Sequence, residues 1–159
     1  MLNFIRKKKD IGLYAPVNGE IIAIEDVPDQ VFASKMMGDG LAFDFHGSLI
    51  YAPCNGKISM IAQTKHAMGI TMKNGIEILI HVGLETVRFQ GKGFDVLVKK
   101  GQRVKIGEPI LQIDRNFFES QGINLITPMI VTNSQNYQIE KKNTKQNVLC
   151  ADEYVICFK

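Results

Sequence analysis

A nine-residue repeat is the feature of this sequence that most restricts its fold. Residues 13–21 read LYAPVNGEI and residues 50–58 read IYAPCNGKI, so most positions are identical or both aliphatic. Each copy contains a proline, which suits the edge or the first residue of a strand, and an Asn-Gly pair, which predicts a turn before a short aliphatic strand. Two copies are too few for a solenoid. The repeat therefore predicts an internally duplicated β-fold.

Short strands are predicted along most of the remaining chain. Residues 100–113 read KGQRVKIGEPILQI and combine glycine turns with short aliphatic runs, as the repeat does. The 14 glycines and 5 prolines punctuate such runs at intervals of about ten residues, which favours an all-β fold, an antiparallel sandwich or a barrel-like one. Helical signals are sparse, although Asp114 is placed to cap one short helix that ends at Gly122. We therefore expect short helices at most.

The length of 159 residues suits one ordinary domain, which we assign to residues 11–159. In residues 1–10, apolar side chains precede four consecutive cations, and we expect a flexible basic tail that is solvated or contacts anionic lipid. The sequence lacks both an apolar run of the roughly 18–20 residues that cross a bilayer and the segment order of a secretory leader. It is therefore expected to have no transmembrane segment.

The net charge and the cysteine content restrict the partners and the cellular location that are expected. The net charge is +3, the basic residues are mostly dispersed, and no nucleic-acid-binding motif is present, so no nucleic-acid partner is expected. The three cysteines are an odd number without CxxC spacing. This usage favours reduced thiols and a cytoplasmic location.

Two of the three histidines lie in neighbouring strand-like runs. His66 belongs to residues 65–72 and His81 to residues 76–83, and Asn74-Gly75 stands between the runs. Asn-Gly between β-branched runs is a strong signal for a two-residue type I′ turn. The sequence therefore predicts that the two runs form a β-hairpin.

With that turn, paired residue numbers add up to 149, so His66 would oppose Gly83 and His81 would oppose Met68. Because side chains alternate between the two faces of a strand, positions 81 and 83 share a face. The two histidines should then lie diagonally across the ladder, about 7–8 Å apart at the backbone. His81 should point away from the apolar stripe of residues 76, 78, 80 and 82. The third histidine, His46, stands beside a glycine turn and is interpreted as incidental.

Two close imidazoles can bind a metal, act as an acid and a base, or carry a phosphoryl group. A zinc site needs three or four protein ligands, and only Asp39 or Glu85 could complete one, so we expect no tightly bound metal or organic cofactor. No GxSxG or Cys-His signature of a nucleophilic hydrolase is present. A phosphoryl carrier needs only a neutral imidazole nitrogen, donors for the phosphoryl oxygens and an apolar rim, and the hairpin can supply all three.

Several separated motifs resemble the glucose-type enzyme IIA of the bacterial phosphoenolpyruvate:sugar phosphotransferase system. They occur in the same order between about residues 14 and 133, which is most of the chain. The matching segments are YAP at 14–16, GDG at 38–40, TKHA at 64–67, GIEILIHVGLETV at 75–87, GKGF at 91–94, GQRV at 101–104 and LITP at 125–128.

This resemblance implies a fold, an activity and a site. The family fold is an antiparallel β-sandwich with an internal duplication, also called a duplicated hybrid motif, and here it would form a single EIIA type-1 domain. The activity would be that of a phosphotransferase component with a phosphohistidine intermediate and no independent turnover. By the resemblance, His81 is phosphorylated at Nε2, His66 donates a hydrogen bond to the phosphoryl group, and Thr64 orients His66.

The resemblance also implies partners. The phosphohistidine carrier HPr would be the donor, and a cysteine of an enzyme IIB domain of a sugar permease would be the acceptor during sugar uptake. Both would use one shallow apolar site in the cytoplasm, with the chain free or peripheral to the inner face of the membrane. The candidate partner-binding residues are Ala62, Leu79, Val87 and Leu41, together with Asp39 and Glu85.

Two other classes of protein with a duplicated β-fold are alternatives. A zinc-dependent peptidase of a related duplicated β-fold would need an HxH pair and an upstream His-x(3)-Asp, which the sequence lacks. A biotin- or lipoyl-type carrier module is also a duplicated β-fold, and Lys35-Met36-Met37 superficially resembles its modified-lysine turn. However, the usual Met before the lysine is absent, the chain is about twice the expected length, and the histidine pair would be unexplained.

Overall fold

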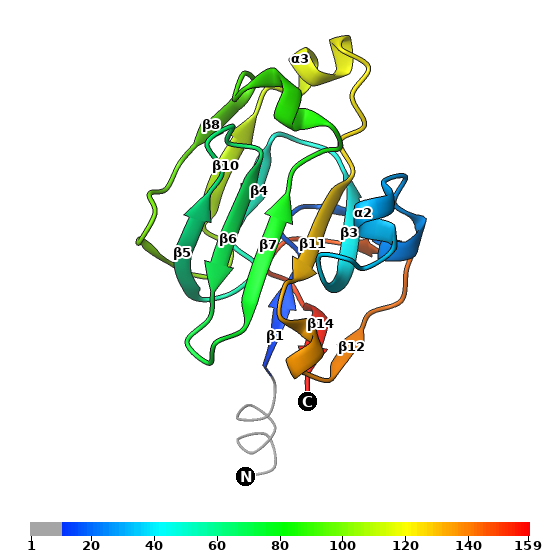
Figure 1. Cartoon of the computed structure of the whole chain (residues 1–159), viewed down its shortest axis with the longest axis vertical. Helices are drawn as coiled ribbons and strands as arrows, with labels where there is room; N and C mark the ends of the chain where they lie inside the picture. Colours follow the sequence, from blue (N-terminus) through cyan, green and yellow to red (C-terminus); the bar gives the residue numbers. More distant parts are fainter. Residues whose placement is uncertain (1–10) are drawn as a thin grey trace.

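The computed structural model describes residues 11–159, in which fourteen strands form three antiparallel sheets (Figure 1). The proposed tail of residues 1–10 lies outside the described part. The largest sheet has the order β13 (Asn147–Val148), β2 (Gly19–Ala23), β3 (Asp39–Phe45), β11 (Thr127–Val131), β7 (Glu77–His81), β6 (Ala67–Thr71), β5 (Gly56–Ile61) and β9 (Arg103–Val104). The predicted all-β antiparallel fold is confirmed.

Two three-stranded sheets accompany the large one. The first has the order β4 (Leu49–Tyr51), β10 (Pro109–Ile113) and β8 (Phe94–Val96), and the second has the order β1 (Ile11–Tyr14), β14 (Tyr154–Phe158) and β12 (Ile139–Lys141). In the second sheet Ile11 pairs with Phe158, so the two ends of the described chain lie side by side at the bottom of Figure 1.

The helical segments are short, as expected. They are η1 (Ile24–Asp26), α2 (Gln30–Ala33), η2 (Thr86–Phe89), α3 (Arg115–Ser120) and η3 (Ser134–Asn136). The Asp114 carboxylate accepts a hydrogen bond from the Phe117 N–H at 3.1 Å, which confirms the predicted cap of α3. Between residues 11 and 159, no helix is long and apolar enough to cross a membrane.

The sequence repeat corresponds to a structural duplication. The Tyr14 N–H donates to Pro53 O at 2.8 Å, and the Tyr51 N–H donates to Pro16 O at 2.7 Å, so the two copies bind each other reciprocally. One copy contributes β1 and β2, and the other contributes β4 and β5. The predicted internal duplication is therefore confirmed at the level of backbone hydrogen bonds.

The asparagines of the repeat differ from the expectation. Gly19 and Gly56 already belong to strands, and the Asn side chains before them bind later loops. Asn18 Oδ1 accepts a hydrogen bond from the Cys150 N–H at 2.7 Å, and Asn55 Oδ1 accepts one from the Ile106 N–H at 2.9 Å. Asn18 thus connects the first copy to the segment after β13, which pairs with β2. Asn55 connects the second copy to the segment after β9, which pairs with β5.

Apolar side chains cover both faces of the large sheet. One face packs on the two smaller sheets in the main core, to which β7 contributes Ile78 and Ile80. The other face carries a second cluster under η1 and α2, in which Leu79 lies with Phe32 and Ala67. The predicted alternation along β7 is confirmed, with His81 on the side of the second cluster.

The β6–β7 hairpin has a different register from the predicted one. Ala67 opposes His81 and Thr71 opposes Glu77, so paired residue numbers add up to 148. The Gly75 N–H donates to Met72 O at 2.9 Å, and Gly75 has φ +93°, whereas Asn74 is not among the residues with positive φ. The turn therefore spans residues 73–75, and the predicted two-residue type I′ turn is wrong.

Replacement of Gly75 by Ala tests this turn. A left-handed φ costs an L-residue about 1–2 kcal/mol, and the added Cβ would meet only Tyr137 OH, at the ordinary contact distance of 3.7 Å. Gly75→Ala should therefore lower the free energy of unfolding by about 1–2 kcal/mol in a denaturant titration. Lys73→Ala, in the same turn without positive φ, should change it little. Equal effects of the two substitutions would contradict the assigned turn.

Candidate functional site

His66 and His81 lie in contact at one end of β7. Their ring centroids are 4.8 Å apart, and the ring planes make an angle of 78°. The predicted pair is therefore present, although the predicted route to it was wrong. In the observed register a regular strand would place the two side chains on opposite faces, because Ala67 rather than His66 shares the face of His81.

The turn before β6 brings His66 to the correct side. Lys65 has φ +63°, and its N–H donates to Ala62 O at 2.8 Å, so the chain reverses before His66. His66 lies outside the regular strand, and its carbonyl oxygen accepts a hydrogen bond from the Val82 N–H at 2.7 Å. The two histidines are therefore brought together by the left-handed conformation of Lys65, and not by the alternation of side chains along a regular strand.

The imidazole of His81 has a defined tautomer. Its Nδ1 lies 2.8 Å from Gly83 O, and a carbonyl oxygen can only accept a hydrogen bond. Nδ1 therefore carries the hydrogen, and the lone pair of the neutral ring is on Nε2. The Phe32 ring packs against the imidazole edge-on, with centroids 4.9 Å apart. His81 consequently has one hydrogen-bonded nitrogen and one nitrogen with a lone pair that is available for reaction.

His66 has a polar partner of its own. Thr64 Oγ1 lies 2.7 Å from His66 Nδ1, which leaves Nε2 free for another interaction. The three residues predicted to carry the chemistry, His81, His66 and Thr64, are therefore brought together. The third histidine, His46, is exposed in the turn between β3 and β4.

Burial favours the neutral form of both histidines. The pKa of His81 is lowered from its ordinary value of 6.5, mainly by burial and then by the neighbouring charge of His66, while the Gly83 carbonyl and Asp29 oppose the shift. The pKa of His66 is also lowered by burial, against the effect of the Thr64 backbone. Both imidazoles are thus able to offer a nitrogen lone pair near neutral pH.

The predicted partner-binding residues are only partly at the surface. Val87 is 51% exposed in η2, and Ala62 is partly buried beside the second cluster. Leu79 is buried in that cluster at 7% exposure. Leu41 is 1% exposed and lies in the main core, so its side chain is not available to a partner. This part of the predicted rim is therefore inaccessible.

The two predicted carboxylates lie in different surroundings. Asp39 binds Lys141 at 2.8 Å and lies 3.8 Å from Lys35, so it belongs to an ion-pair cluster. Glu85 is exposed with φ +61° and, with Arg88, lines a cavity of about 430 Å³. Among residues 11–159, no group of three or more His, Cys, Asp or Glu side chains is arranged to hold a metal ion.

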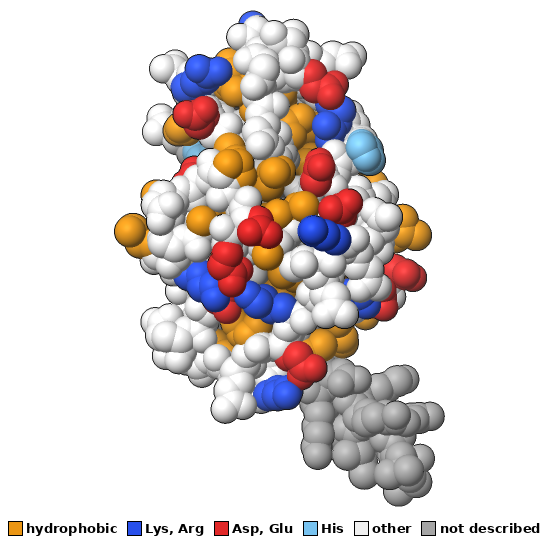
Figure 2. All heavy atoms as spheres, turned by 90° about the vertical axis from the view of Figure 1, so that its right-hand side faces the viewer, with side chains coloured by type: hydrophobic (Ala, Val, Ile, Leu, Met, Phe, Trp, Pro, Cys, Tyr) orange, Lys and Arg blue, Asp and Glu red, His pale blue; other side chains and the backbone are white. Residues whose placement is uncertain are grey.

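The segment around α2 contributes to the site, although it was not predicted from the sequence. Asp29 caps α2 by accepting a hydrogen bond from the Val31 N–H, and its charge raises the pKa of His81. Phe32, three residues later, packs on the His81 imidazole. Further apolar side chains of this segment are exposed: Val31 at 41%, Met36 at 76% and Met37 at 39%. Figure 2 shows this side of the molecule, where hydrophobic side chains are exposed between charged ones. A four-residue helix is too short to give a periodic pattern in the sequence. The adjacent methionines Met36 and Met37 were the sequence signal that could have indicated an exposed apolar segment.

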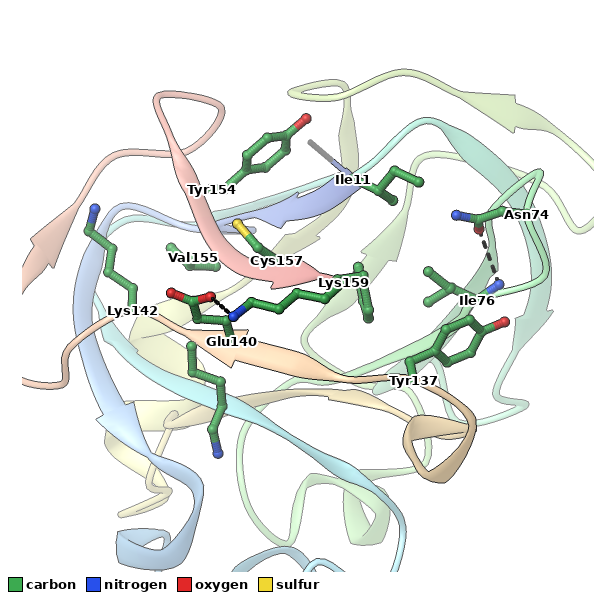
Figure 3. A pocket seen from close by; sticks show the side chains of 12 residues that line it. Ile11, Asn74, Ile76, Tyr137, Glu140, Lys142, Tyr154, Val155, Cys157 and Lys159 are labelled. Carbon is green, nitrogen blue, oxygen red and sulfur yellow. Dashed lines mark hydrogen bonds and ion pairs between the residues drawn. The ribbon is translucent and has the colours of Figure 1, made fainter. Parts of the chain in front are cut away.

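A second cavity, of about 870 Å³, lies at the other end of β7 (Figure 3). It is lined by the β6–β7 hairpin and by residues of β12 and β14, among them Asn74, Ile76, Tyr137 and Val155. An ion pair between Glu140 and Lys159, at 2.9 Å, lies beside it. No histidine lines this cavity, so the imidazole chemistry belongs to the opposite end of the strand.

Comparison with known proteins identifies relatives that match most of this chain. Residues 11–137 match the family model described as phosphoenolpyruvate-dependent sugar phosphotransferase system, EIIA 1. The chain is 44% identical over 126 residues to a Staphylococcus epidermidis protein named PTS system glucose-specific EIIA component, covering 79% of this chain and 76% of the relative. The solved structure of glucose permease IIA from Mycoplasma capricolum has a TM-score of 0.86 at 34% identity, and the match covers 93% of this chain and 96% of that one.

Some relatives are much longer. The chain is 45% identical over 132 residues to a Staphylococcus carnosus protein named PTS system glucoside-specific EIICBA component. The match covers 83% of this chain but 19% of the relative. The chain thus spans about a fifth of the length of this fused relative.

The histidine pKa values predict a pH dependence of stability. Because the folded protein binds the imidazole protons more weakly than the unfolded chain, stabilisation by the neutral pair is complete above the ordinary pKa of 6.5. It is lost as the pH falls from that value through the lower folded-state pKa values. ¹⁵N NMR titration should place both folded pKa values below 6.5, and urea unfolding of a His66→Gln/His81→Gln variant should lose the corresponding slope. An unchanged slope would contradict the assignment.

Proposed function

Because this chain belongs to the EIIA 1 family of the phosphoenolpyruvate-dependent sugar phosphotransferase system, a family of phosphoryl carriers, we propose that it carries the phosphoryl group on His81 Nε2. The observation that supports this choice of atom is the hydrogen bond between His81 Nδ1 and Gly83 O. It leaves the lone pair on Nε2, and the lowered pKa keeps the ring neutral. A neutral ring nitrogen is the nucleophile that the reaction needs.

In the proposed reaction the Nε2 lone pair attacks the phosphorus atom of a phosphohistidine on the donor protein. The new N–P bond forms as the N–P bond to the donor breaks, and the donor imidazole recovers its lone pair. In the second half of the cycle a cysteine thiolate of the acceptor attacks the same phosphorus. The S–P bond forms as the N–P bond to His81 breaks, the electron pair of that bond returns to Nε2, and His81 leaves as the neutral imidazole that has kept its hydrogen on Nδ1. Alignment and electrostatic stabilisation supply most of the catalysis in such transfers.

His66 is the proposed donor to the phosphoryl oxygens. We assign the Thr64 hydroxyl as donor to His66 Nδ1, across the 2.7 Å contact, so that the hydrogen of His66 is on Nε2. With the ring centroids 4.8 Å apart, that N–H is near the place where negative charge gathers on the equatorial oxygens. His66 thereby acts on the transferred group, Thr64 orients His66, and His81 binds the group.

The proposed partners are HPr as donor and an enzyme IIB domain of a sugar permease as acceptor, in the cytoplasm. Relatives are named for glucose and for glucosides, which supports a role in sugar uptake. The proposed apolar rim consists of exposed side chains on the two segments that flank His81: Val31, Met36 and Met37 on and after α2, and Val87 in η2. A rim of this kind suits brief complexes in which both partners use one surface in turn.

Substitution of the histidines separates their roles. His81→Gln should abolish phosphorylation by phospho-HPr, because the attacking nitrogen is lost. His66→Gln should still accept the group slowly but fail to pass it to enzyme IIB. His46→Gln, at an exposed turn, serves as the matched control and should behave as the unmodified chain. The measurement is acid-labile ³²P on the protein, and label retained on His81→Gln would refute the assignment.

Charge in the rim should impair docking without changing the chemistry. Met36→Asp and Val87→Asp should each slow transfer from phospho-HPr by roughly tenfold, since a central apolar contact of a complex is worth more than about 1 kcal/mol. Phosphorylation by the small donor phosphoramidate should be unchanged, because it needs no protein interface. Leu149→Asp places the same charge at an apolar side chain that is 62% exposed elsewhere and should affect neither reaction. An equal loss with both donors would instead show damage to the site itself.

A further inference from the structure

Two buried threonines meet the segment that holds His81. Thr86 and Thr127 are the buried polar residues of the described chain, and each is 0% exposed. A buried hydroxyl costs free energy unless it is hydrogen-bonded, and valine would fill the same volume without that cost. The two hydroxyls therefore stabilise something that packing alone would not.

Both hydroxyls bind one peptide group. Thr86 Oγ1 donates to Val82 O at 2.7 Å, on one side of the peptide that joins Val82 and Gly83. On its other side, the Gly83 N–H donates to Thr127 Oγ1 at 3.4 Å. Thr127 in turn donates to Leu125 O at 3.0 Å, which fixes the direction of its hydroxyl hydrogen. Rotation of this peptide would break hydrogen bonds on both sides.

The orientation of this peptide sets the position of the Gly83 carbonyl. Gly83 has φ +75°, and a Cβ at this position would lie 2.7 Å from Thr86 Cγ2, so the bend is tight. The following peptide is held by the Leu84 N–H, which donates to Asn124 O at 2.8 Å. Between these two fixed groups, Gly83 O points at His81 Nδ1, 2.8 Å away.

The same short segment also contacts the second histidine. The Val82 N–H donates to His66 O at 2.7 Å, so the backbone of one histidine and the side chain of the other are bound to adjacent residues. A displacement of residues 82–83 would therefore change the distance between the two imidazoles as well as the hydrogen bond to Nδ1.

We propose that Thr86 and Thr127 are positioning residues of the phosphoryl site, which hold the Val82–Gly83 peptide so that the Gly83 carbonyl keeps the hydrogen of His81 on Nδ1 and the lone pair on Nε2. This inference rests on the proposed function of His81. The threonine hydroxyls bind the backbone of residues 82, 83 and 125 and not the imidazole, so each acts through the carbonyl that it helps to place.

The test compares variants that lose each threonine hydroxyl at nearly constant side-chain volume with variants that keep it. Thr86→Val and Thr127→Val remove the hydroxyls, whereas Thr86→Ser and Thr127→Ser keep them and lose a methyl group. Thr132→Val is the matched control, because Thr132 contacts Glu77 at the opposite end of β7. The first readout is the tautomer of His81, from the ¹⁵N shifts and ¹H–¹⁵N couplings of its ring, which needs no phosphoryl donor. The second is the rate of His81 phosphorylation by phosphoramidate.

The valine variants should populate the form with hydrogen on Nε2 and react roughly tenfold more slowly, the factor for one hydrogen bond of ordinary strength. The serine variants and Thr132→Val should match the unmodified chain. Loss of the Gly83 acceptor should lower the pKa of His81 further, because that carbonyl raises it, whereas a merely loosened loop would raise the pKa toward 6.5.

Valine variants with an unchanged tautomer and rate would overturn the inference, and so would equal losses in the serine and valine variants. A cooperative thermal transition shows that a valine variant is folded. Because the two threonines bind opposite sides of one peptide, one folded valine variant is enough for the comparison. If the unmodified chain were not phosphorylated on His81 at all, the proposed function would fail, while the tautomer measurement would still decide whether the threonines position the carbonyl.

Discussion

Strand β7 is packed on both faces, and the arrangement of the site follows from this constraint. Ile78 and Ile80 lie in the main core, while Leu79 lies in the second cluster under α2. Hydrogen-bonded neighbours on both sides, β6 and β11, leave the strand no freedom to shift. His81, its last residue, therefore has a fixed position at the edge of the second cluster, where burial lowers its pKa and Phe32 covers one side of the ring.

Local chemistry in the sequence predicted the parts of the structure that depend on short-range signals. The repeat, the cap at Asp114 and the alternation along β7 each follow from a few neighbouring residues, and each is present. The hairpin register was not predictable in this way, because the same Lys-Asn-Gly segment fits two turns that differ by one residue. The contact between the two histidines depends on the left-handed φ of Lys65, and a lysine side chain gives no reason to expect that conformation.

The site also depends on contacts between distant segments, which one sequence does not reveal. Phe32 reaches His81 across 49 positions of the chain, and Thr127 reaches Gly83 across 44. The resemblance supplied the roles proposed for His66 and Thr64. The rim expected from it included Leu41, although β3 turns that side chain into the main core. Face assignment on a strand with two apolar faces is ambiguous, since alternation marks which side chains share a face but not which face is outside.

The pairing of Ile11 with Phe158 has a consequence for protein architecture. The described chain enters and leaves the fold on adjacent strands, at the same end as the β6–β7 hairpin, whereas His81 is at the opposite end of β7 (Figure 1). The two ends of the described chain therefore lie together on the side of the fold away from the imidazoles. Ends placed in this way suit a domain that is joined to further polypeptide, as the matched part of the long EIICBA relative is.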